Sequence, residues 1–370
     1  MNRRDFFKYS IAVGSVFALS PMLTSCAGVH RKSFYENHGG FTMPDLPEKT
    51  TRILSYAALS PSGHNTQPWI VKIKSPSEII IQSDKTRWLP EVDPTNRETF
   101  LSLSAFAETL CLASHAVGFD AEISIIAEDL KDSDIFQVKL NEMPTKNERY
   151  LGFIKNRVTT RTDFDKKEIK TEQINEVLNI EPEHIEYFPL ESNGGKWIAE
   201  NLPEAVKQQS FNNDKQEELS HWLRFSKSEA KERGDGITAE ALGLNWFARF
   251  VWYNFYSQKS AMEDSFRNRG IDTAREQVEN CSGFVVLTSK DNSLDSIFDS
   301  GRLYQKIGLK LTELGIAHHT MSQLLEEEPW SSEIKSNLKI DQPVQFVIRI
   351  GYGEDSKPSI RRPVRSFVVS

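Results

Sequence analysis

The strongest constraint on the fold is a pair of long amphipathic helical segments, each ending at a glycine. In the first, Arg97 to Gly118, apolar side chains recur at helical spacing. The second runs from Leu294 to Gly315. Residues 303–316 align without gaps with residues 106–119, and the two glycines are 197 positions apart (315 minus 118). Strand-like sequence precedes both helices, which suggests an internal duplication. Any two amphipathic helices that end at glycine look alike, however, so the repeat alone leaves duplication open.

The N-terminus is typical of an export signal, a segment that does not form part of the folded body. Segment 2–8 has a twin-arginine pattern, and the apolar stretch 11–23 is shorter than the roughly 20 residues that a membrane-spanning helix needs. Residues 23–26 resemble a lipobox, in which acylation of Cys26 would anchor the chain. We therefore expect a signal over 1–26 and a tether over 27–46. The alternative is an ordinary cleaved signal with a chance cysteine.

Such a protein would be exported by the twin-arginine route and lipid-anchored to a bacterial membrane, facing the periplasm or the cell exterior. The membrane leaflet that holds the anchor is left open. Because this route exports folded proteins, the signal suits a chain that loads a cofactor before export.

Composition indicates a soluble globular body and narrows the choice of partners. Hydrophobic residues make up 38% of the chain and aromatic residues 10%. The formal net charge of -7 argues against nucleic acid as a partner. With Cys26 in the anchor, Cys111 and Cys281 remain, and we expect each to be a small buried apolar residue rather than half of a disulfide. No Cys/His spacing suggests zinc, so no metal site is predicted.

Periodicity predicts further elements along the chain. A short helix is expected over 51–59, and a polar helical region is predicted over 200–231. Segment 128–147 is charged and is predicted to lie as an extension at the protein surface. The aromatic run 246–256 is expected in an interface core or lining a lid. Strands are expected over 69–74, 78–82, 283–288 and 344–350.

The most specific stretch runs from Ala57 to Trp69. It resembles the Pro-Ser-x-x-Asn-x-Gln-Pro-Trp signature of the nitroreductase superfamily, whose members bind FMN. A flavin presents carbonyls, ring nitrogens and ribityl hydroxyls, which match the hydroxyl and amide groups of Ser62, Asn65 and Gln67. Trp69 starts the next strand and is expected in the core. The alternative for the whole stretch is a polar surface turn.

Three further segments carry the same resemblance. Arg157 to Phe164 resembles the family's Arg-x-Ser/Thr-x-Arg-x-Phe element, although its Phe comes one residue later. Guanidinium groups match phosphate oxygens, and in the family this element holds the FMN phosphate. A solvated basic patch is the alternative. The C-terminal Gly-Tyr-Gly and basic element is also expected at the phosphate, through either Arg361 or Arg362. The segment after Gly315 is expected near the flavin ring. The implied cofactor-binding residues are Ser62, Asn65, Gln67, Arg157, Thr159, Arg161, His319, Thr320, Arg361 and Arg362.

No catalytic residue is identified. His318 and His319 could act as acid or base groups, but a structural role is at least as well supported.

The order of the motifs favours a fused form of the family. Ordinary members are short chains that dimerise, with each flavin between subunits. Here the Pro-Ser loop lies in the first half, the arginine element opens the second, and no second Pro-Ser-x-x-Asn follows. The chain therefore looks most like the Acg-type FMN-binding oxidoreductases.

This resemblance implies an α+β fold of two fused half-folds, 47–150 and 151–370, each with a mostly antiparallel sheet flanked by helices. A lid insertion is expected over 197–236. No clear arginine element precedes Arg52, so a second flavin is not expected.

The resemblance implies an FMN-dependent oxidoreductase that reduces a small aromatic or quinone-like acceptor from an unidentified electron donor. The alternative is an FMN-sequestering protein with a covered flavin and little turnover. A single chain would already be a pseudo-dimer, and a true homodimer is left open.

Overall fold

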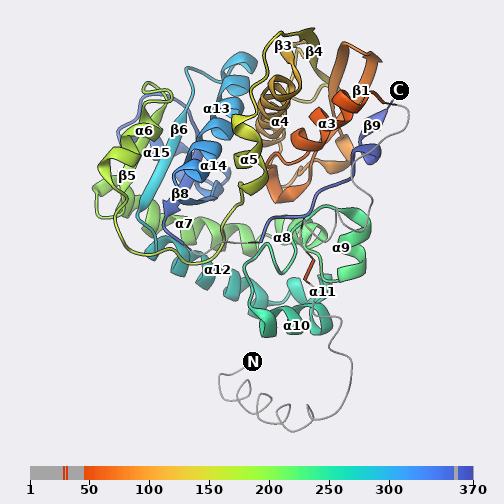
Figure 1. Cartoon of the computed structure of the whole chain (residues 1–370). Coiled ribbons are helices and arrows are strands. Elements are labelled where there is room, and N and C mark those ends of the chain that lie inside the picture. The colour runs from red at the N-terminus through yellow and green to blue at the C-terminus, as the bar shows by residue number, and fades with distance from the viewer. Residues whose placement is uncertain (1–27, 30, 32–45, 354–356, 370) are drawn as a thin grey trace.

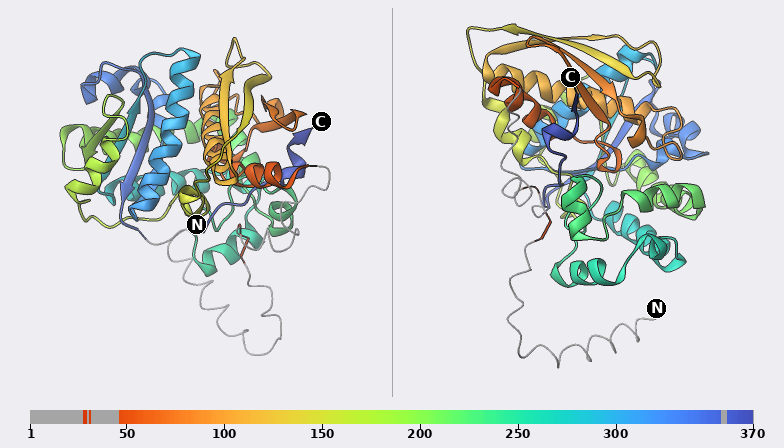
Figure 2. Two further views of the ribbon diagram at one scale, coloured as in Figure 1. Left: turned by 45° about the horizontal axis from the view of Figure 1, so that its top comes forward. Right: turned by 90° about the vertical axis from the view of Figure 1, so that its right-hand side faces the viewer.

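A computed structural model describes residues 28–29, 31, 46–353 and 357–369. The predicted signal, Cys26 and most of the predicted tether lie outside the described residues. The architecture is α+β, as predicted, with two separate sheets and helices packed between and beneath them (Figures 1 and 2).

The first sheet has five strands in the order β3-β4-β2-β1-β9. The four strands from β1 to β4 pair antiparallel, whereas β9 lies parallel to β1. Because β9 comes from the far C-terminus, the end of the chain completes the sheet built by its beginning. The bounds are β1 (Trp69–Ser75), β2 (Glu78–Ser83), β3 (Phe119–Ile125), β4 (Asp134–Glu142) and β9 (Val368–Val369).

The second sheet has four antiparallel strands in the order β5-β6-β8-β7. Its bounds are β5 (Ile185–Pro189), β6 (Gly283–Thr288), β7 (Ala317–Thr320) and β8 (Val344–Gly351). Both sheets follow one plan: two strands, a long helix, an edge strand, and a strand that returns to the middle. In this correspondence β1, β2, β3 and β4 match β5, β6, β7 and β8.

The two long helices, α4 (Arg97–Val117) and α13 (Leu294–Glu313), lie side by side between the sheets (Figure 2). Each is followed by a glycine in the left-handed region, Gly118 with φ 86° and Gly315 with φ 68°, as expected for a helix that ends at glycine. The helices approach closely at Gly301, where an added Cβ would lie 2.5 Å from the Leu101 carbonyl oxygen. Small residues thus set their separation.

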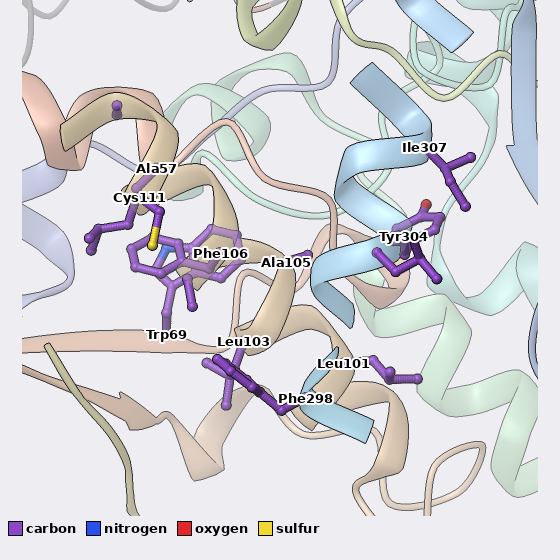
Figure 3. Packing of buried hydrophobic residues seen from close by; sticks show 14 of the residues in the cluster. Ala57, Trp69, Leu101, Leu103, Ala105, Phe106, Cys111, Phe298, Tyr304 and Ile307 are labelled. Carbon is purple, nitrogen blue, oxygen red and sulfur yellow. The ribbon is translucent and has the colours of Figure 1, made fainter. Parts of the chain in front are cut away.

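The main hydrophobic core joins both sheets to both long helices. Trp69 is fully buried, as predicted, and its ring stacks on Phe106 with 4.8 Å between centroids. Figure 3 shows these rings beside Cys111, with Tyr304 and Ile307 extending from α13. Cys111 and Cys281 are both free and buried, in agreement with their predicted role as small apolar residues.

A long insertion separates β5 from β6, where the first sheet has a tight hairpin between β1 and β2. Its helices pack beneath both halves (Figure 1). They are α7 (Asn193–Phe211), α8 (Asn213–Trp222), α9 (Lys227–Arg233), α10 (Trp246–Phe255), α11 (Gln258–Ala261) and α12 (Asp264–Glu279). The predicted lid range falls within this insertion.

The remaining elements connect the layers. The helices are α3 (Glu48–Ala57), α5 (Arg149–Asn156), α6 (Thr171–Leu178), α14 (Gln323–Glu326) and α15 (Trp330–Leu338), and the 3-10 turns are η2 (Gly63–Asn65), η3 (Lys85–Arg87) and η4 (Val364–Ser366). Within the described part of the chain, α4 is long and apolar enough to cross a membrane, but 89% of its apolar window is buried, so it is a core helix.

Two expectations were wrong. The charged stretch 128–147 contains a central strand, β4, whose buried Ile135, Phe136 and Val138 fill the core between charged neighbours. The aromatic run 246–256 is not wholly interior, because Trp246 and Phe255 are 76% and 72% exposed.

Candidate functional site

The loop between α3 and β1 holds an unusual backbone conformation. His64, Asn65 and Gln67 all have positive φ, at 45°, 56° and 55°. Non-glycine residues rarely adopt this region, and such strain persists only where surrounding contacts fix it.

Those contacts come from the insertion and the C-terminal segment. Asn65 Nδ2 donates to the carbonyls of Gly236 at 2.8 Å and Ile360 at 3.1 Å. Gln67 Nε2 donates to the Gly234 carbonyl at 2.9 Å, and Gln67 Oε1 accepts from the Arg362 backbone N–H. The Asn65 and Gln67 amides are therefore fully used by the protein itself. Ser62 is half-buried, and its Oγ accepts from the Gln67 N–H at 2.9 Å.

Arg361 and Arg362 belong to the same network. Arg361 Nη1 donates to Asn65 Oδ1 at 2.8 Å, and its Nη2 donates to the Leu59 and Ser60 carbonyls. Arg362 Nη2 donates to the carbonyls of Gln67 and Trp69. Both guanidinium groups are buried, so in this structure they hold the loop in place.

Arg157 carries a buried positive charge with few hydrogen bonds to compensate it. It follows the C-terminus of α5 and is 3% exposed, yet its Nε and Nη1 have no hydrogen-bond partner. It forms no ion pair with any carboxylate among the described residues, and burial lowers its pKa. Gly308 of α13 leaves room for it, since an added Cβ there would lie 3.4 Å from Arg157 Cδ.

Arg161 and Thr159 lie on the same segment and are partly accessible. Arg161 Nη1 donates to the Ala241 carbonyl of the insertion at 3.3 Å. Burial lowers the pKa of Arg161 to about 10. Burial and, to a lesser extent, the Arg161 charge lower the pKa of His64 to about 4. The fold therefore brings the arginine element of the second half close to the loop of the first.

Strand β7 supplies the third side of the site. The His318 carbonyl accepts from the Thr160 N–H at 2.9 Å, which ties β7 to the arginine element. Burial, followed by the Arg157 charge, lowers the pKa of His318 to about 3. The pKa of His319 is also lowered, by burial and then by Arg349 and Arg161. Thr320 Oγ1 lies 2.8 Å from the hydroxyl of Tyr304.

Three residues at this site escaped the sequence analysis. Arg349 is fully buried on β8, where its Nη1 and Nη2 donate to the carbonyls of Gln277, Thr160 and Thr162. Gln305 lies one turn before Gly308 on α13 and is buried, and neither of its amide atoms has a hydrogen-bond partner. The hydroxyl oxygen of Thr162 is also buried and has no hydrogen-bond partner. An arginine within the apolar strand Val344–Gly351 was the available signal for Arg349.

The electrostatics of the site favour an anion. A buried charge is costly unless an opposite charge or hydrogen bonds compensate it. Arg157 and Arg161 approach each other closely enough that the Arg157 charge contributes to the lowered pKa of Arg161, and no carboxylate among the described residues forms an ion pair with either group. A phosphate could accept from the unpartnered atoms of Arg157, and Thr159 and Arg161 could add donors.

Cavities of about 640 Å³ and 290 Å³ lie elsewhere in the fold. The larger lies between the residues that follow β6 and the first half of α13, and the smaller is lined by residues around Leu190 and Lys196. Neither is lined by His64, Arg157, Arg161 or His319.

No protein-family model matches the chain, and no curated protein matches it. Several solved structures are similar. A nitroreductase with bound FMN from Bacteroides fragilis is 14% identical, with 56% of this chain and 90% of that chain covered and a TM-score of 0.32. An FMN-dependent nitroreductase from Mycobacterium smegmatis in complex with NADPH is 16% identical, with 57% and 91% covered and a TM-score of 0.35. A chain from Anabaena variabilis, provisionally named a nitroreductase, is 8% identical, with 89% and 92% covered and a TM-score of 0.42. Values this low do not by themselves place the chain in a family.

Proposed function

We propose that this protein binds FMN at the site formed by Arg157, Arg161, His64 and β7, and that it acts as an FMN-dependent oxidoreductase. The observation that carries the proposal is Arg157, a buried guanidinium that has two unpartnered nitrogens and forms no ion pair with a carboxylate in the part of the chain that the structure describes. A buried anionic group would compensate that charge. The nitroreductase-like motifs of the sequence identify FMN as the anion.

In this proposal the residues divide into three groups. Arg157, Thr159 and Arg161 hold the phosphate, and His64, His319 and Thr320 lie toward the remainder of the cofactor. The third group supports the site indirectly, because its polar atoms already bond the loop to the insertion and the C-terminal segment. It consists of Asn65, Gln67, Arg361 and Arg362. They would fix the strained loop before the ligand arrives, which lowers the entropy lost on binding.

A bound FMN would supply hydride and electron transfer, while the protein positions it and tunes its potential. The arginines around the site favour an anionic ligand. His318 and His319 are neutral at pH 7 because their pKa values are lowered, so neither is a ready proton donor there. This fits chemistry that the cofactor carries. A small aromatic or quinone-like acceptor is the proposed substrate class, with an electron donor still to be identified.

A second candidate function is sequestration of FMN with little turnover. The insertion favours it, because residues 234–236 bond directly to Asn65 and Gln67 and the Ala241 carbonyl accepts from Arg161. Gly243 also packs on the arginine element, where an added Cβ would lie 2.5 Å from Thr162 Cγ2. A flavin enclosed in this way would meet only small reactants.

Anaerobic absorbance spectroscopy separates the two functions. NADPH is added to the FMN-loaded protein, followed by dithionite. Bleaching by NADPH, with recovery on addition of a quinone, supports the oxidoreductase. A flavin that resists NADPH and quinols but bleaches with dithionite supports sequestration. Failure to hold FMN at all contradicts both.

We also propose that the chain is a fused pseudo-dimer, exported by the twin-arginine route and anchored to a bacterial membrane through a lipidated Cys26. The matching plans of the two sheets support the fusion. Mass spectrometry of the purified protein tests the anchor, because acylation adds a defined mass at the new N-terminus.

A further inference from the structure

One helix of the insertion exposes a cluster of aromatic side chains. Trp246, Phe250 and Phe255 of α10 are 76%, 46% and 72% exposed, and we call these three side chains the aromatic face. The Phe250 and Phe255 rings touch edge to face, with 6.3 Å between centroids. The opposite side of the helix is anchored, because the buried Trp252 stacks on Phe225 at 4.8 Å. The aromatic face is therefore held rigidly on the outside of the molecule.

Exposed large hydrophobic side chains are concentrated on α10. Of the seven large hydrophobic side chains that are exposed among the described residues, four belong to α10 and its C-terminal cap. Single exposed apolar residues need no explanation, whereas a contiguous patch marks an interaction surface. Figure 1 places α10 at the outer end of the insertion, away from both sheets.

The N-terminal segment meets the molecule beside this helix. Val29 is buried against Ala230 and Ile360, and its N–H donates to Glu240 Oε1 at 3.0 Å. Glu240 in turn lies 3.9 Å from Arg249 of α10. An added Cβ at Gly28 would lie 3.1 Å from Arg249 Nη1, so Gly28 lies beside the end of the Arg249 side chain of α10.

Cys26, the predicted lipid attachment point, precedes Gly28 by two residues. Two residues of extended chain span at most about 7 Å, which limits the distance between Gly28 and a lipid attached at Cys26. Acyl chains attached there would enter a bilayer close to the aromatic face.

We propose that the aromatic face of α10 docks on the bilayer surface beside the lipidated N-terminus. Tryptophan and other amphipathic aromatic rings favour the headgroup region, and one lipid signal holds a protein more firmly when a second contact assists it. The anchor and the helix together would then fix the orientation of the protein on the membrane, which a lipid on a loose tether would not.

The test uses the complete protein, purified from membranes and reconstituted into vesicles whose acyl chains carry bromine, which quenches nearby tryptophans. We expect quenching of the wild-type fluorescence, with most of that quenching lost in Trp246→Phe. The matched control is Trp330→Phe, because Trp330 is half-buried against the second sheet and donates to Asn201. That variant should retain the quenching.

Two results would overturn the proposal. One is brominated-lipid quenching that is absent in the wild type or unchanged in Trp246→Phe. The other is a homodimer, detected by light scattering, that dissociates when Trp246, Phe250 and Phe255 are changed to serine, because the face would then be an interface between copies. Phe211→Ser is the control for the serine substitutions, since Phe211 is 45% exposed on a different helix. Quenching of Trp246 without acylation of Cys26 would still support docking.

Discussion

Arg157 holds a positive charge inside the fold, and no carboxylate within residues 46–353 or 357–369 forms an ion pair with it. If it binds the FMN phosphate, Arg157→Ala should raise the FMN dissociation constant by roughly ten- to a hundredfold, because a hydrogen bond to a charged group contributes about 1.5–3 kcal/mol. Isothermal titration of the FMN-free protein measures this.

The control for that substitution is Arg52→Ala, which removes an arginine that pairs with Glu148 at the surface. It should bind FMN like the wild type. Equal affinity in Arg157→Ala and the wild type would contradict a phosphate role for Arg157.

His318 makes the stability of the FMN-free protein depend on pH. Its pKa is about 3 in the fold against an ordinary 6.5, so between these values the unfolded chain binds the proton more readily. Stability should therefore fall as pH falls from 6.5 toward 3, by up to about 1.4 kcal/mol per pH unit from this residue. Urea unfolding at pH 7 and pH 5 should show a smaller loss in His318→Asn than in the wild type. An equal loss in both would show that His318 does not carry this dependence.

At the scale of elements, the loop of residues 60–67 and the insertion hold each other in place. Asn65→Ala would leave the Gly236 carbonyl without its donor and Arg361 without one of its acceptors, and the Ile360 carbonyl would keep only its bond from Arg361 Nη1. We expect a loss of about 2–4 kcal/mol of stability without FMN, since each buried unsatisfied group costs about 1–3 kcal/mol. Thermal unfolding measures it. Asn337→Ala, which loses one exposed bond within a helix, is the control. An unchanged Tm in Asn65→Ala would show that this network does not hold the loop.

The packing of α4 on α13 depends on the absence of a side chain at position 301. Gly301→Ala would place its Cβ 2.5 Å from the Leu101 carbonyl oxygen and from Ser104 Cβ, so the helices would have to separate. Overpacking of this kind costs about 1–3 kcal/mol. Gly270→Ala on α12 meets nothing within 4 Å and should stabilise the protein slightly through helix propensity. Chemical denaturation of both variants gives the comparison, and equal stability would contradict this close approach.

Strong local patterns made most elements predictable. The strands β1, β2, β6 and β8 and the helices α4 and α13 were predicted to within a few residues, because each has a clear period and a turn signal at its end. Strand β4 was missed because charged residues separate the apolar side chains that it buries. The exposure of α10 was missed because aromatic residues usually indicate a core.

At the site, the sequence indicated which segments meet but not how their side chains are used. His64 and Arg161, from opposite halves, do come together. The involvement of Asn65 and Gln67 with residues 234–236 depends on tertiary contacts with the insertion, which no local pattern reveals. Arg349 and Gln305 lie within ordinary strand and helix sequence, so no motif marked them as buried polar residues of the site.

At the scale of the whole molecule, two similarly built halves enclose a site to which they contribute different residues. The loop with strained His64 comes from the first half, and the arginine element and β7 come from the second. The sequence offers no second pair of these motifs. The protein should therefore bind FMN at one site, although its two halves share one plan of strands and helices.

The most direct measurement is the ratio of FMN to protein after the purified chain is saturated with FMN and passed through a desalting column. Absorbance of the flavin and of the denatured protein gives this ratio. We predict one FMN per chain, and a large loss of retained flavin in Arg157→Ala. A chain that retains no FMN, or that retains two, would contradict a single flavin site shared between the halves.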